Sequence, residues 1–110
     1  MAFDDKNRLW LDALRLQSMS SGHLCLNLSE NVSWEDFGGY AEQLLRVLKG
    51  RKLDAAESPD IRMWGVMVHG HVLRLVFDDY PTMLSLESSD DNGDKVLRQV
   101  EAQLIDMKKG

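Results

Sequence analysis

The stretch RMWGVMVHGHVLRLVFD, residues 62–78, decides the fold of this chain. It holds two runs rich in β-branched and large apolar residues, and the His69-Gly70 pair between them predicts a tight hairpin turn. DDYP at residues 78–81 predicts a second turn, and TMLSLES at residues 82–88 continues as a further strand. Together the three runs predict an antiparallel meander.

Both faces of the central hairpin are apolar in sequence, because Met63 and Met67 alternate with Trp64, Val66 and Val68. An antiparallel sheet with one solvated face should instead alternate apolar with polar residues. We therefore expect both faces of this sheet to be covered. The cover is either a helix near the N-terminus or a second molecule.

The flanking segments complete the fold class. Residues from about Phe3 to Met19 have mostly helical spacing, and HLCLNLS at residues 23–29 alternates like a strand. A helix follows over about residues 33–50, then a short edge strand at 52–57, and apolar residues at 96–107 form the stripe of a final helix. The prediction is an α+β fold with an antiparallel sheet of four to five strands and three helices, in the order α-β-α-(β)-β-β-β-α.

The middle helix carries the clearest signals. Ser33 followed by Asp36 resembles a capping box, and Gly50 stands where a helix would end. Gly38-Gly39 inside this helix costs about 1 kcal/mol per glycine against alanine. We expect the pair to permit close packing on the sheet, with a ligand as the alternative.

Composition bounds the class of protein. At 110 residues, with 44% hydrophobic and 28% charged residues, the chain reads as one globular domain spanning residues 1–110. The single cysteine excludes an internal disulfide and fits a reducing compartment. The acidic N-terminal stretch does not resemble a secretion signal, and the apolar runs are too short to span a bilayer. We expect a cytoplasmic protein without membrane contact.

The net charge of −5 is concentrated in the second half of the chain, which holds six basic and ten acidic residues. No lysine or arginine occurs between Arg74 and Lys95. Such a field repels phosphates and attracts basic surfaces, which disfavours direct nucleic-acid binding. We predict that a basic protein binds an acidic surface around this stretch, and the residues assigned to it are Asp78, Asp79, Tyr80, Glu87, Asp90, Asp91 and Asp94.

The stretch SSDDNGDKVLRQVE, residues 88–101, has the ligand spacing of a calcium loop at Asp90, Asn92, Asp94 and Glu101. However, Lys95 replaces the glycine of the sixth position, and a predicted strand precedes the loop where a helix is needed. Acids are also favourable near the positive end of a helix dipole. We therefore predict a helix start here and no metal site.

The remaining candidate groups give no catalytic site. His23, His69 and His71 are too few ligands for a closed zinc site, which needs four and usually includes thiolates. Cys25 lies among leucines on a predicted strand, with no base or orienting group at hand. No phosphate-binding glycine loop or serine elbow is present. We predict a protein that is not an enzyme and has no cofactor.

The arrangement from the SWEDF helix through the meander to VLRQVEAQL, about residues 33–107, resembles small acidic bacterial α+β families, some uncharacterised and some toxin-immunity proteins. This resemblance implies a stoichiometric inhibitor of a cognate toxin. From the residues themselves we expect a protein-binding module with a basic partner, and a homodimer is possible. The alternatives are a small-molecule or metal-binding regulatory domain, with a pocket near Gly38-Gly39 or on the second sheet face, and an enzyme whose residues the sequence does not reveal.

Overall fold

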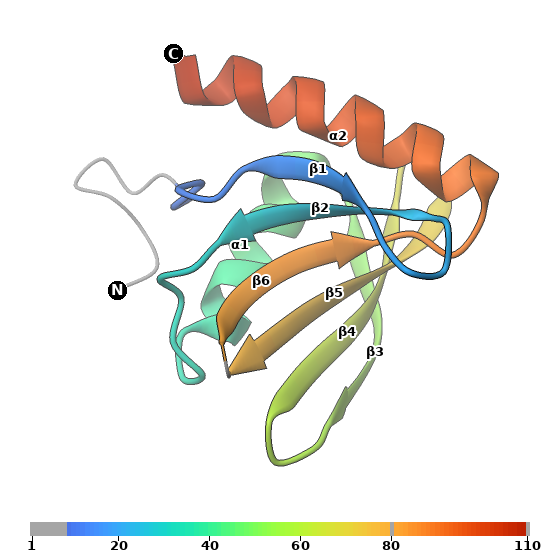
Figure 1. Cartoon of the computed structure of the whole chain (residues 1–110). Coiled ribbons are helices and arrows are strands. Elements are labelled where there is room, and N and C mark those ends of the chain that lie inside the picture. Colours follow the sequence, from blue (N-terminus) through green and yellow to red (C-terminus); the bar gives the residue numbers. More distant parts are fainter. Residues whose placement is uncertain (1–8, 80, 110) are drawn as a thin grey trace.

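The computed structural model describes residues 9–79 and 81–109. Within these residues it contains a six-stranded antiparallel sheet of order β1-β2-β6-β5-β4-β3 and two helices (Figure 1). The strands are β1 (Arg15–Ser18), β2 (Leu24–Ser29), β3 (Arg51–Glu57), β4 (Ile61–Val68), β5 (His71–Asp79) and β6 (Thr82–Glu87). The helices are α1 (Phe37–Leu48) and α2 (Asp91–Lys109).

The predicted meander is confirmed as β4, β5 and β6. Val68 pairs with His71 across a two-residue turn in which His69 and Gly70 both have positive φ, of 52° and 74°. Two consecutive residues with positive φ are typical of a type I′ turn, whose twist matches that of the flanking strands. The turn therefore sets the register that aligns Trp64 with Leu75, and β6 continues the same row at Leu86.

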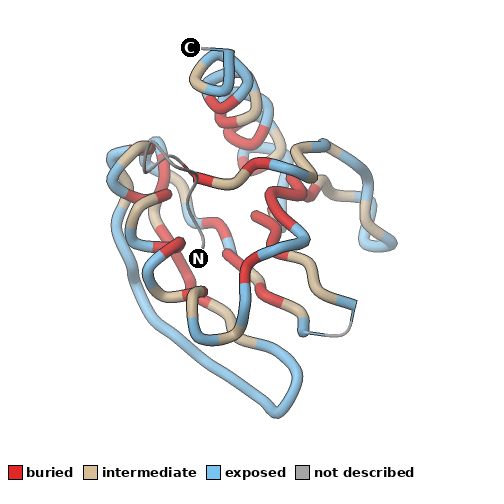
Figure 2. Tube along the Cα trace, turned by 90° about the vertical axis from the view of Figure 1, so that its left-hand side faces the viewer, coloured by how far each residue is buried: buried red, intermediate tan, exposed pale blue. Residues whose placement is uncertain are grey.

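Both helices cover one face of this sheet. The ring of Phe37 in α1 packs edge-on against Trp64, with ring centroids 5.6 Å apart. The side-chain amide of Gln103 in α2 donates to the carbonyl of Val47, at the surface of α1, so the two helices lie on the same side. Figure 2 shows the buried positions gathered between the helices and the sheet. One hydrophobic cluster therefore contains the covered face and both helices.

The segment before β1 is fixed to this core by two polar anchors. The hydroxyl of Tyr40, fully buried in α1, donates to the carbonyl of Trp10 at 2.6 Å. The carboxylate of Asp12 accepts from the Ser29 hydroxyl at 2.6 Å and the backbone N–H of Glu30 at 3.1 Å. Partial burial raises the pKa of Asp12, but these hydrogen bonds outweigh it and the pKa is lowered overall. The anchored segment closes the core beside the start of α1.

The α+β class is confirmed, but the predicted number of elements is wrong, because the sheet has six strands and the described residues form two helices. The described part of the expected N-terminal helix, residues 9–19, contains β1, and residues 1–8 lie outside the described residues. The run Leu14 to Ser18 begins with the two-residue alternation of apolar and polar side chains that is typical of a strand. The helical spacing of the preceding apolar residues obscured this short alternation. In the structure Leu16 pairs with Leu26 of β2.

The ends of α1 also differ from the prediction. The Ser33 hydroxyl accepts from the backbone N–H of Asp36 within a turn, and the helix begins only at Phe37. The left-handed residue at its C-terminal end is Lys49, with φ 57°, instead of Gly50. Gly50 is needed for another reason, because a Cβ there would lie 2.6 Å from the backbone oxygen of Met67.

The expected role of Gly38-Gly39 is wrong. A Cβ at either position would meet nothing within 4 Å, so the pair does not serve close packing. The expected cover of the second sheet face by a helix near the N-terminus is also wrong for the described residues, since both of their helices lie on the other face. Cover by a second molecule stays a prediction. Among residues 9–79 and 81–109, neither helix is long and apolar enough to cross a membrane.

Candidate functional site

The face of the sheet that carries no helix among the described residues is a candidate binding surface, here called the open face. Strand register places alternate residues of β4, β5 and β6 on it. Val72 is 50% exposed and Ile61 39%, and the other apolar members are partly exposed. The apolar set consists of Ile61, Met63, Met67, Val72, Val76 and Met83. Methionine side chains adapt their shape to a partner, which suits such a surface to protein recognition.

A polar row crosses the open face between these apolar residues. Arg74 pairs with Glu87, with Arg74 Nη2 3.0 Å from Glu87 Oε1. Next along the row, the backbone N–H of Gly65 donates to Asp54 Oδ1 at 3.1 Å. On the other side of Glu87, burial and the nearby charge of Glu87 raise the pKa of the Cys25 thiol. The thiol is therefore held in its unreactive neutral form.

One end of the open face is acidic. Ile61 pairs with Asp78, and the backbone N–H of Asp79 donates to the carbonyl of Asp60 at 3.0 Å. We call Asp60, Asp78 and Asp79 the acidic end. These contacts bring the ends of β4 and β5 together, so three acidic residues gather at this end of the strand pair, with Asp78 directly across from the exposed Ile61.

Arg62 is the nearest basic residue along β4, and it belongs to the covered face. Its guanidinium carbon lies 5.1 Å from the ring centroid of Phe37, and Nη1 donates to the carbonyl of Trp34 at 2.7 Å. Its Nε lies 3.3 Å from Glu57 Oε2. Arg62 therefore stabilises the start of α1 from the covered face.

The structure divides the predicted partner-binding residues between opposite ends of the sheet. Asp78 and Asp79 belong to the acidic end, whereas Glu87 and the acids that follow it lie one full length of β6 away, about 20 Å for six residues. Tyr80 lies outside the described residues. The six described members of this set therefore lie in two separate groups instead of one continuous acidic surface.

The second group holds the start of α2 in place. Asp90 Oδ1 accepts from the backbone N–H of Gly93 at 2.7 Å and lies 2.9 Å from His71 Nε2. Those two bonds, first of all the one from Gly93, lower the pKa of Asp90 despite some desolvation. The helix start predicted in this stretch, at Asp91 or Gly93, is thus confirmed at Asp91, with Asp90 as the cap.

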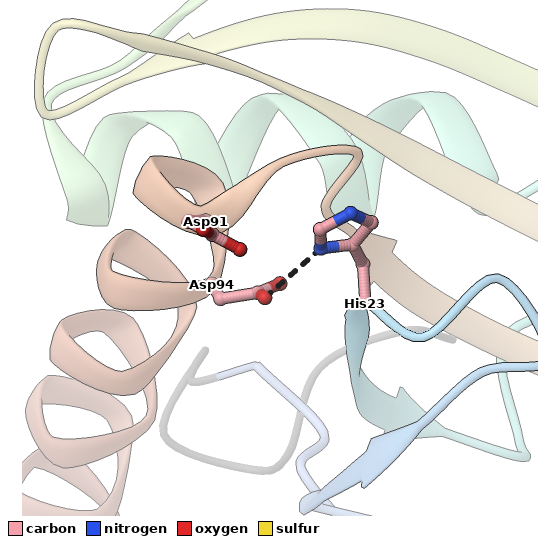
Figure 3. A group of neighbouring side chains, drawn as sticks. All are labelled: His23, Asp91 and Asp94. Atoms are coloured by element: carbon pink, nitrogen blue, oxygen red, sulfur yellow. Dashed lines mark hydrogen bonds and ion pairs between the residues drawn. The ribbon is translucent and has the colours of Figure 1, made fainter.

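Asp94 joins α2 to the start of β2 (Figure 3). Its Oδ1 accepts from the backbone N–H of Leu24 at 2.9 Å, and its Oδ2 lies 3.1 Å from His23 Nδ1. The bond from Leu24, followed by that of His23, lowers the pKa of Asp94 to about 2. The same side-chain bond raises the pKa of His23. Sequence reasoning missed this pairing, because the two residues are 71 positions apart.

His23, Asp91 and Asp94 each offer one ligand atom, and these atoms all lie within 4.8 Å of one another. Figure 3 shows both carboxylates on the side of the helix that faces the imidazole ring. Both oxygens of Asp94 already accept hydrogen bonds, and the positive end of the α2 dipole opposes a cation at this place. The cluster is better explained as a structural tether than as a metal centre.

The fold defines this protein as a compact α+β protein in which the described helices cover one face of the sheet and leave the open face without a helix. Residues 14–105 match the family described as "Protein of unknown function (DUF3630)", and the chain belongs to that family. The match assigns no catalytic family. No curated protein and no solved structure matches the chain. The resemblance to toxin-immunity proteins stays a prediction.

Proposed function

We propose that this protein is a non-catalytic protein-binding module that engages a basic partner, as an inhibitor or immunity-type protein would. The proposal rests on one observation. The apolar residues of the open face are bordered at one end by the acidic end, which consists of Asp60, Asp78 and Asp79. A cytoplasmic location is part of this proposal, supported by the free, buried Cys25.

The two parts of this surface have different roles in binding. The carboxylates of the acidic end attract a basic partner over a distance of about 10 Å at 0.1 M salt and speed its encounter. Ile61, Val72 and the three methionines supply apolar area that becomes buried in the complex. The pair Arg74–Glu87 crosses the apolar area and fixes the orientation of a partner through its polar groups.

The acidic end supersedes the seven-residue surface in this proposal. Asp78 and Asp79 remain in it, and Asp60 joins them through the backbone bond from Asp79. Asp90 and Asp94 bond to histidines and backbone N–H groups within the chain, so their first role is to hold α2. We expect neutralisation of these two to affect stability more than partner binding.

The test is affinity capture from the native organism with quantitative mass spectrometry, at about 50 and 300 mM salt. The bait variants are D60N/D78N/D79N and a control, E42Q/E101Q/D106N, which removes three charges from the helices. We expect wild type and control to retain the same basic protein and the acidic-end variant to retain at least tenfold less at low salt. Equal retention by all three baits would remove the acidic end from the proposal.

The second candidate is regulation by a metal ion, which the closeness of His23, Asp91 and Asp94 favours. A metal that bound this cluster would raise the melting temperature as its concentration exceeded its Kd. Because both oxygens of Asp94 are already engaged, we expect the same melting curve in calcium, in zinc and in EDTA. A chelator-sensitive rise that D91N removes would establish the metal site instead.

A further inference from the structure

The two edges of the sheet are unlike. At one edge, β1 is only four residues long, and α2 approaches the segment before it, where the Lys108 ammonium donates to the carbonyl of Leu11 at 3.0 Å. At the other edge, β3 is seven residues long and, within the part of the chain that the structure describes, pairs with β4 alone. All seven of its residues are exposed. Figure 2 shows this as an uninterrupted exposed stretch that continues into the β3–β4 hairpin. An edge of this kind presents unpaired backbone N–H and C=O groups.

The middle of β3 carries an apolar residue in an unusual position. The register with β4 shifts between Lys52 and Asp54, so Leu53 has no partner across the strand pair. Its side chain is 40% exposed, which makes it one of few large apolar side chains so exposed among the described residues. Bulges often blunt edge strands. Here the bulge exposes a leucine, which favours contact with another chain.

The order of charges along β3 favours one kind of partner. Lys49, Arg51 and Lys52 are basic before and at its beginning, whereas Glu57 and Asp60 are acidic at and beyond its end. Asp54, the middle residue, accepts a hydrogen bond from the backbone N–H of Gly65 in β4. An antiparallel copy of the same strand sets each basic end beside the acidic end of its neighbour. A strand with a single sign of charge would meet repulsion at both ends. The charge order is therefore self-complementary only in the antiparallel arrangement.

We propose that β3 pairs antiparallel with β3 of a second copy of this chain, joining the two sheets into one. The two-fold axis then lies perpendicular to the sheet, because the interface uses the same strand on both copies. Such an axis places the two open faces on the same side of the joined sheet. The dimer thus presents a doubled open face, although its formation does not depend on the function proposed for that face.

The pairing is tested by sedimentation equilibrium of the full chain at about 5 to 500 µM, the range expected for a small interface. We expect dimers at the higher concentrations. R51E/K52E places acids beside acids at both ends of the contact and should raise the dimer Kd at least about tenfold. L53K should weaken dimers too, and V72K on the open face should leave the Kd unchanged.

A charge-exchange variant separates pairing from general charge effects. In R51E/K52E/E57K/D60K the order of charges is reversed within each copy, so antiparallel copies are complementary again and dimers should return to within about threefold of wild type. Circular dichroism and melting temperature verify that each variant is folded. A wild-type chain that stays monomeric throughout the range would overturn the proposal. A dimer whose Kd is the same in wild type, R51E/K52E and L53K would also overturn it.

Discussion

The covered and open faces of the same sheet differ in what their apolar residues do. On β5, Leu73, Leu75 and Phe77 are almost completely buried, whereas their neighbour Val72 on the open face is half-exposed. The chain supplies helices for the first face and, among the described residues, none for the second. An apolar side chain in a strand can therefore belong either to the internal core or to a surface that is available to another protein.

The largest expected effect contrasts L75A with V76A. Leu75 has no exposed surface, so its truncation leaves a cavity and should lower the free energy of unfolding by about 2–5 kcal/mol. Val76 is partly exposed on the open face, and its truncation should cost less than about 1.5 kcal/mol. Urea denaturation below 5 µM measures both. Equal losses would mean that the open face is covered in solution.

Y40F tests how the covered face is closed. The variant keeps the buried ring but removes the hydroxyl that donates to the carbonyl of Trp10. The carbonyl then lacks its partner, and the free energy of unfolding should fall by about 1–2 kcal/mol. Urea denaturation measures it, with fluorescence and circular dichroism as independent probes. Unchanged stability would show that the segment around Trp10 does not contribute to closing the core.

D94N tests the tether at the start of α2 through its dependence on pH. The pKa of Asp94 is lowered to about 2, so its contribution to stability is present above its usual value of 3.8 and is lost as the pH falls towards 2. The pKa of His23 is raised, so its contribution is complete below 6.5 and is lost as the pH rises through the raised value. The negative charges of Asp90 and Asp91 also raise the pKa of His23, as Asp94 does.

The destabilisation by D94N should therefore be largest between about pH 4 and 6.5 and smaller at pH 8.5. Urea denaturation of wild type and variant at pH 5.5 and 8.5 gives the difference. H23Q is the matched control, because it keeps a polar side chain and removes the titrating partner. If the wild-type advantage over D94N were the same at both values, the His23–Asp94 bond would not contribute to stability.

The smallest expected change in stability comes from a substitution in the turn between β4 and β5. His69 has a φ of 52°, which asparagine adopts at lower cost, so H69N should raise stability by a few tenths to about 1 kcal/mol. H71N on the other side of Gly70 is the control and should give no gain, since it loses the contact with Asp90. Calorimetric melting distinguishes the two. A loss in H69N would mean that the imidazole itself stabilises the turn.

Local patterns predicted the parts of this fold that depend on near neighbours. The alternation in β4 and β5, the turn at His69-Gly70 and the start of α2 all follow from residues close in sequence. The strand β1 was misread because the leucines at helical spacing obscured a four-residue alternation. Short runs of this length carry too few residues to separate the two periods.

The candidate site was less predictable, because it depends on contacts between distant residues. The acidity of the second half was visible, but only the antiparallel course of β5 and β6 shows that Asp79 and Glu87 lie at opposite ends. No pattern pointed to Asp60 as a neighbour of Asp79 or to His23 as the partner of Asp94. Such pairs form only when the whole sheet is assembled.

The most direct test of the open face uses the methionines as reporters. Met63, Met67 and Met83 lie on that face, whereas Met107 lies on α2 and packs against the core. The measurement is NMR of ¹³C-methyl methionine while the protein captured by wild type is added. We predict shifted or broadened signals for the three open-face methionines and an unchanged signal for Met107. Signals that change at Met107 while the open-face methionines stay constant would contradict the account.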